Sequence, residues 1–135
     1  MNDSKLMNRA ADNIRILAAS MVEKANSGHP GGAMGGADFV NVLFSEFLVY
    51  DPQNPRWEGR DRSPMLYSVL AFTGKYTLDE LKQFRQWGSP TPGHPEVNVD
   101  RGVENTSGPL GQGHTYAVGA AIAAKFLKAR FGEVM

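Results

Sequence analysis

The sequence predicts a fold of helices joined by glycine- and proline-rich loops. Apolar residues recur at helical spacing along much of the 135-residue chain, and hardly one stretch resembles a strand. The 15 glycines and 8 prolines gather at 27–36, 51–62 and 88–113. The length fits one ordinary domain or a fragment of something larger. A fragment is a live alternative because this set of helices would not readily enclose a core without a sheet.

Two helices are expected in the first third of the chain. The first runs from Ser4 to about Asn26 on apolar residues at near-helical spacing, and Ser27-Gly28 then stops it. The second covers Asp38 to Leu48 and is apolar around most of its circumference, which predicts that it is buried. The tract 51–55 is a turn-rich connection.

Three further helices are expected after this connection. The first runs from Ser63 to Phe72 with a proline in its first turn, and the second starts at the capping-box sequence of residues 77–80 and reaches about Trp87. Residues 88–107 are expected to be loop. The last helix, from about Gln112 to Phe131, is rich in alanine, and Gly132 ends it. An alanine-rich helix usually packs closely against neighbouring elements, and a chain of this length need not provide them.

The composition excludes several classes of function. The 14 Lys and Arg residues balance 14 Asp and Glu residues without a basic run, which argues against nucleic acid or an anionic membrane as a partner. The absence of cysteine rules out disulfides and Cys-ligated zinc and suits a reducing compartment. No apolar run is long enough for a signal peptide or a membrane span. We therefore expect a soluble, cytoplasmic protein.

The segment Thr106–Gly113 is the most informative part of the chain. It places three glycines and a proline at the mouth of the alanine-rich helix. Helix N-termini bind phosphates through unpaired N–H groups and the helix dipole, and glycines remove the Cβ atoms that would hold a phosphate away. The segment matches neither the GxxxxGK[ST] loop nor the GxGxxG turn. The alternative is a turn that merely starts a buried helix, which is the better interpretation of an isolated glycine cluster.

Two of the three histidines, His29 and His94, lie in glycine- and proline-rich loops. In both, glycine precedes and proline follows the imidazole, so the backbone holds the ring in place. Such a histidine suits hydrogen bonding to a substrate hydroxyl or proton transfer near neutral pH. The alternative is a hydrogen bond to a nearby carbonyl group. The second Gly-His-Pro and the phosphate-type loop together favour a functional role.

The other polar candidates carry weaker signals. His114 opens the last helix, where a cation would oppose the dipole, so we expect a neutral ring or a peripheral position. Glu96 and Glu104 could orient neighbours or lie in solvent. Arg85 and Arg101 could meet an anionic substrate, although such arginines more often form surface or interface pairs. No cluster has a convincing metal spacing, so no metal-ligating residue is assigned within the chain.

Four segments together resemble the start of the transketolase family, in the same order and spacing. The resemblance covers nearly the whole chain and is specific as a combination, whereas the related deoxyxylulose-phosphate synthases differ at the last segment. It implies an α/β fold, with residues 1–135 forming the N-terminal portion of the diphosphate-binding domain and the remaining domains absent. The segments are residues 27–35, 81–89, 91–96 and 108–113.

The resemblance implies transfer of a two-carbon ketol unit from a ketose phosphate to an aldose phosphate with thiamine diphosphate, as in the pentose phosphate pathway. It makes His29 and His94 the residues that contact the donor's hydroxyls and help to move protons. Gly108, Pro109 and Leu110 would lie against the cofactor, with Gly108 near the diphosphate and Leu110 near the ring system. The implied enzyme is a homodimer with a divalent cation (Mg or Ca) bound mainly by residues outside this chain.

The chain departs from the family in two places. The family has a short strand and a Gly-His pair where Arg62 runs directly into Ser63 here. Either both are deleted or the numbering runs across an omitted segment; the second is favoured because loss of a central strand should cost the fold dearly. The chain also stops before the family's Gly-Asp-Gly metal and diphosphate segment, and His114 replaces a usually apolar residue, which leaves its role open.

These departures lead us to expect a chain that is inactive alone, either a fragment or one subunit of a split enzyme. A rival interpretation is a non-catalytic module that binds phosphate or a nucleotide through the loop from Gly108 to Gly113. The preferred donor and acceptor sugars do not follow from the sequence.

Overall fold

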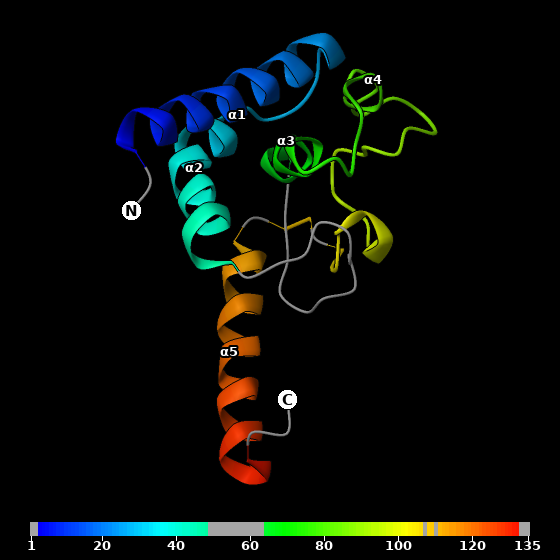
Figure 1. The fold of residues 1–135 in the computed structure, drawn as a ribbon. Coiled ribbons are helices and arrows are strands. Elements are labelled where there is room, and N and C mark those ends of the chain that lie inside the picture. Colours follow the sequence, from blue (N-terminus) through cyan, green and yellow to red (C-terminus); the bar gives the residue numbers. More distant parts are fainter. Residues whose placement is uncertain (1–2, 49–63, 107, 110, 133–135) are drawn as a thin grey trace.

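The structure is a computed structural model and describes residues 3–48, 64–106, 108–109 and 111–132. Helix α1 (Ser4–Ala25) packs on α2 (Gly31–Val42) and on α3 (Pro64–Phe72), and the short α4 (Leu78–Leu81) lies beside α3 (Figure 1). Helix α5 (Gln112–Phe131) projects away from this group. Within the described ranges there is no β-strand, only an isolated antiparallel bridge between Asn98 and Val103. The portion present is therefore mostly helix and loop, as predicted.

Helix α1 has the predicted bounds because both of its ends are capped. The Asp3 side chain accepts a hydrogen bond from the Lys5 N–H at 2.8 Å, and Asn26 ends the helix in the left-handed conformation at φ 48°. Ala11, Ile14, Ala18 and Met21 form its buried face.

Helix α2 begins at Gly31, seven residues before the predicted start at Asp38, so that prediction was wrong. Pro30 supplies a φ of −75° ready for a helix, and its carbonyl accepts the Met34 N–H at 2.9 Å. The small side chains of Ala33 and Ala37 are buried. Close packing against α1 thus offsets the poor helix propensity of the glycines.

The predicted burial of the second helix was also wrong for the described part of the chain. Helix α2 continues into η1 (Leu43–Phe47), a single π-helical turn. Phe39 and Phe47 are 68% and 71% exposed. Only one side of the helix packs against α1 and α3.

Arg15 joins α1 to α2 through polar contacts. Its Nε donates to the Met34 carbonyl at 3.1 Å, and its two terminal nitrogens pair with Asp12, on α1, and with Asp38, on α2. The N-terminal half of α2 is therefore fixed on α1 by the same residue that neutralises Asp38.

The larger core cluster is built around Tyr67 on α3. The Tyr67 ring meets Tyr76 edge-on with centroids 5.4 Å apart and Phe84 at 6.2 Å. Its hydroxyl donates to the Pro92 carbonyl at 3.1 Å. Burial raises the pKa of the Tyr67 hydroxyl, so this group stays a neutral donor. The cluster contains Met21, Leu66, Tyr67, Leu70, Tyr76, Leu81, Phe84 and Val103.

Helix α4 has the predicted capping box but ends at Leu81, so the predicted extension to Trp87 was wrong. Thr77 and Glu80 cap each other, with the Thr77 N–H donating to Glu80 Oε2 at 2.8 Å. The chain then leaves the helix because Arg85 adopts φ 61° and donates its N–H to the Thr91 carbonyl at 3.0 Å. This bond turns the backbone toward the second histidine.

Helix α5 spans the predicted residues, and the Gly132 N–H caps its end by donating to the Lys128 carbonyl at 2.9 Å. None of its residues is buried, although Tyr116, Ile122 and Phe126 are large and apolar. The expected close neighbours are not supplied by the described residues. No helix in the described ranges is both long enough and apolar enough to cross a membrane.

The Glu80 carboxylate predicts a pH-dependent contribution to stability. Hydrogen bonds from Thr77 and from Arg101, whose Nη1 lies 2.6 Å from Oε1, lower the pKa of Glu80. A lowered pKa in the folded state gives stability that is full above the unfolded value of about 4.3 and is lost as the pH falls through the folded value. Glu80→Gln should therefore destabilise the chain at pH 7, and the deficit should shrink between about pH 5 and about pH 3.

Urea unfolding across this pH range measures the effect, with Glu23→Gln, on an exposed part of α1, as the matched control. A deficit of Glu80→Gln that stays constant with pH would contradict this role of the carboxylate.

Candidate functional site

The candidate site is a cleft of about 790 Å³ beside the second histidine loop (Pro90–Glu96). We call it the histidine cleft. Its main lining residues come from α3, from the connection between α3 and α4, from the turn after α4 and from the loop itself. They are Tyr67, Tyr76, Arg85, Trp87, His94 and Glu96.

The structure brings His94 and Gly108 together. A Cβ atom built on Gly108 would lie 3.8 Å from Cγ of the His94 ring, so the imidazole stands against the backbone of the glycine-rich segment. The turn between them is closed by the Asn98–Val103 bridge. The Val97 N–H also donates to Thr106 Oγ1 at 2.9 Å. These bonds bring two predicted site residues, fourteen positions apart in the sequence, beside each other at the rim of the cleft that His94 lines.

The glycine-rich segment leads directly into α5. Gly111 is the N-cap with φ 79° and provides no side-chain cap, so N–H groups at the start of α5 lack a partner from that residue. Gly108 and Pro109 are exposed beside this helix start. Leu110, the third predicted cofactor contact, lies outside the described residues. This geometry suits an anion such as a diphosphate.

The second histidine loop is held from behind. Buried Thr91 donates from its hydroxyl to the Glu80 carbonyl at 3.0 Å, and the Pro92 carbonyl accepts the Tyr67 hydroxyl. A Cβ on Gly93 would lie 3.1 Å from the Arg85 guanidinium carbon, so the side chain of Arg85 lies across this glycine. The loop backbone is therefore fixed while the His94 side chain stays exposed.

His29 lies on the connection between α1 and α2, and its side chain is exposed. Gly28, just before it, has φ 130°, and a Cβ there would lie 3.3 Å from the Phe84 ring. Neither His29 nor His94 forms a side-chain hydrogen bond with another residue in the described ranges. Both loops thus contact the same aromatic cluster. The two imidazoles are not hydrogen-bonded to each other.

The two candidate arginines, Arg85 and Arg101, have different surroundings. Arg101 pairs with Glu80 and lies over the Tyr76 ring at 4.9 Å, which is the structural role that is commoner for such arginines. Arg85 lines the histidine cleft and forms no ion pair with a described residue.

The remaining polar candidates form no metal site that the structure describes. Glu96 lines the cleft, and His114 is exposed in the first turn of α5. Within residues 3–48, 64–106, 108–109 and 111–132, no three His, Asp or Glu side chains gather as a metal ion would require.

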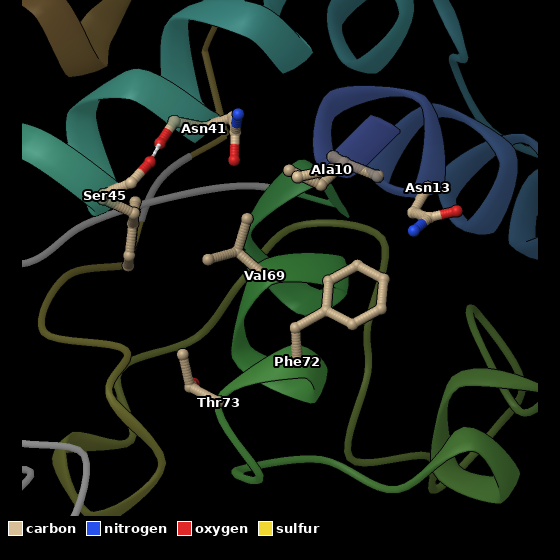
Figure 2. Close-up of a pocket in the computed structure, with 9 residues that line it drawn as sticks. Ala10, Asn13, Asn41, Ser45, Val69, Phe72 and Thr73 are labelled. Carbon is tan, nitrogen blue, oxygen red and sulfur yellow. Dashed lines mark hydrogen bonds between the residues drawn. The ribbon is translucent and has the colours of Figure 1, made fainter. Parts of the chain in front are cut away.

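A second hollow, of about 300 Å³, lies between α1, α3 and the end of α2 (Figure 2). Ala10 and Asn13 come from α1, Val69 and Phe72 come from α3, and Thr73 follows the end of α3. Its lining contains no ionisable side chain and none of the predicted site residues. It cannot perform acid–base chemistry, so the histidine cleft is the candidate site.

Comparison with known proteins identifies the family of the chain. The profile of the family described as "Transketolase, thiamine diphosphate binding domain" matches residues 6–134. The chain belongs to this family. It is 52% identical over 132 residues to transketolase 1 of Escherichia coli and 48% identical over 141 residues to the chloroplastic transketolase-1 of Arabidopsis thaliana. These alignments cover 91% and 97% of the chain.

Solved transketolases share the fold. The crystal structure of transketolase from Campylobacter jejuni matches 98% of the chain with a TM-score of 0.77 and 44% identity. A transketolase from Pichia stipitis in complex with sedoheptulose-7-phosphate matches 89% with a TM-score of 0.73 and 39% identity. The chain spans about a fifth of the length of these relatives: 20% of the E. coli protein, 19% of the A. thaliana and P. stipitis proteins, and 22% of the C. jejuni protein.

Gly28 is predicted to be essential to the first histidine loop, the connection of residues 26–30 between α1 and α2. At φ 130°, with a Cβ only 3.2 Å from Val22 and 3.3 Å from Phe84, Gly28→Ala should destabilise the chain by about 1–3 kcal/mol. Gly35→Ala is the control, because it lies inside α2 with no atom within 4 Å of a new Cβ. This control should stabilise by about 0.5–1 kcal/mol. Urea unfolding of both variants measures the difference, and equal effects would contradict the strain at Gly28.

Proposed function

We propose that this chain is the N-terminal part of a transketolase that transfers a two-carbon ketol unit from a ketose phosphate to an aldose phosphate. The observation that carries the proposal is that the His94 ring lies beside Gly108, before the entrance of α5, where a Cβ atom on Gly108 would lie 3.8 Å from the ring. It places a side chain that can transfer protons beside a backbone that can bind an anion. Support comes from relatives of about 50% identity and from the P. stipitis enzyme, whose ligand is a ketose phosphate.

Thiamine diphosphate fits the described residues. The exposed backbone N–H of Gly108 and the N–H groups at the start of α5 would face the diphosphate together with the positive end of a twenty-residue helix, while Pro109, which has no N–H, shapes the turn between them. Leu110 is proposed to lie near the ring system. When bound, this cofactor supplies the electron sink for breaking and forming the carbon–carbon bond.

His94 and His29 are proposed to bind hydroxyl groups of the donor and to move protons. Both rings are exposed on supported loops, and an imidazole near neutral pH can donate or accept a proton. Arg85 offers a guanidinium in the same cleft as His94, where it would attract the phosphate of a sugar phosphate.

The complete protein would supply what these residues do not. We propose that residues 1–135 are the N-terminal portion of the diphosphate-binding domain and that a divalent cation, Mg or Ca, is held mainly by residues outside the chain. A homodimer in the cytoplasm, acting in the pentose phosphate pathway, completes the proposal. The 135-residue chain alone is expected to show no turnover, because it spans only a fifth of its relatives.

Calorimetry on the complete polypeptide separates this proposal from a non-catalytic phosphate or nucleotide module. Thiamine diphosphate, ATP and a ketose phosphate would each be titrated in the presence of Mg. Binding of thiamine diphosphate with ketol transfer supports the proposal. Tight binding of ATP without binding of thiamine diphosphate would overturn it in favour of the module.

His94→Ala in the complete enzyme should lower kcat/KM for a ketose phosphate donor about a hundredfold, the usual scale for a proton-transferring residue. Cofactor affinity should change much less, since the backbone of Gly108 remains. The control is Glu23→Ala, on an exposed part of α1, which should behave as wild type. Unchanged kcat/KM in His94→Ala would remove His94 from the mechanism.

A further inference from the structure

Two buried aromatic side chains, Tyr67 and Phe84, stand behind both histidine loops. Tyr67 is 1% exposed and Phe84 is 2% exposed, and their rings meet edge-on with centroids 6.2 Å apart. One comes from α3 and the other from the turn after α4. Neither is among the groups expected to contact cofactor or substrate.

Tyr67 holds the loop that carries His94. Its hydroxyl donates to the carbonyl of Pro92, two residues before His94, at 3.1 Å. Pro92 has no N–H, so this carbonyl is the only hydrogen-bonding group that its backbone offers. Arg85 lies across the next residue, Gly93, and so limits movement of the loop from that side.

Phe84 supports the loop that carries His29. The Phe84 ring lies so close to Gly28 that a Cβ there would approach it to 3.3 Å, and Val22 closes the same space at 3.2 Å. His29 follows at once. The backbone of this loop therefore lies against Phe84, whose ring packs on Tyr67, the residue that holds the His94 loop.

We propose that Tyr67 and Phe84 are positioning residues, which set the separation and orientation of His94 and His29 for the donor substrate. This inference rests on the proposed function. The imidazoles are exposed and form no hydrogen bonds with other described residues, so their place depends on the backbone behind them. Small misplacement of groups that bind a reacting substrate lowers the rate strongly.

The test separates positioning from a purely structural role by comparing Tyr67→Phe with Leu70→Val in the complete enzyme. Tyr67→Phe keeps the ring and removes only the hydroxyl. Leu70 is fully buried in the same cluster, and its side chain has no polar atom to bond either histidine loop. Both variants should lower the urea midpoint of unfolding.

Only Tyr67→Phe should lower kcat/KM for the donor at saturating thiamine diphosphate, by about fivefold, the factor that corresponds to one neutral hydrogen bond. It should also speed amide hydrogen exchange in residues 85–97, where the Arg85 N–H donates to the Thr91 carbonyl. Leu70→Val should leave both measurements close to wild type. An unchanged kcat/KM in Tyr67→Phe, or an equal loss in Leu70→Val, would overturn the inference.

Phe84→Leu tests whether Phe84 supports the loop that carries His29. The readout is amide hydrogen exchange of the Ser27 N–H, which donates to the Val22 carbonyl at 3.3 Å. Its exchange should quicken in Phe84→Leu and not in Leu70→Val, and equal exchange would exclude Phe84 as a support.

The two failures can be told apart. A wild-type enzyme without ketol transfer would refute the proposed function, while the exchange comparison would still decide whether Tyr67 holds the His94 loop.

Discussion

The hydrogen bond from the Tyr67 hydroxyl to the Pro92 carbonyl is the contact on which the site depends. It joins the most buried helix of the described chain to the loop that presents His94. Burial raises the pKa of the hydroxyl, and the neighbouring rings of Tyr76 and Phe84 leave it little room to turn. The bond thereby ties the backbone of the loop to the core, while the His94 side chain remains exposed.

The loop held by this bond also leads to the proposed cofactor-binding residues. The loop passes from Pro92 to His94, and the His94 ring stands against Gly108 at the start of α5. The imidazole can bind the donor substrate, whereas the glycine backbone and the helix dipole can bind a diphosphate. The exposed length of α5 fits a chain that spans about a fifth of its relatives.

Much of the helical structure could be predicted because its signals are local. The ends of α5 and the start of α4 follow from Gly132 and from the capping box at Thr77. The start of α2 was missed because packing on α1 overrides the propensity of its glycines. The end of α4 was missed because Arg85 turns toward a carbonyl six residues later. His94 and Gly108 became candidates through their motifs and the family resemblance, whereas their position beside each other is seen only in the structure. The supporting role of Tyr67 depends on a partner twenty-five residues away, which no periodicity reveals.

The central claim is that His94 and the glycine-rich entrance of α5 form one wall of a thiamine diphosphate site. The most direct measurement is a crystal structure of the complete protein with thiamine diphosphate and a divalent cation. The account predicts the diphosphate against the backbone of Gly108 and the first turn of α5, with the His94 ring beside it and the Tyr67–Pro92 bond intact. A diphosphate bound away from Gly108, or a His94 ring turned out of this wall, would contradict it.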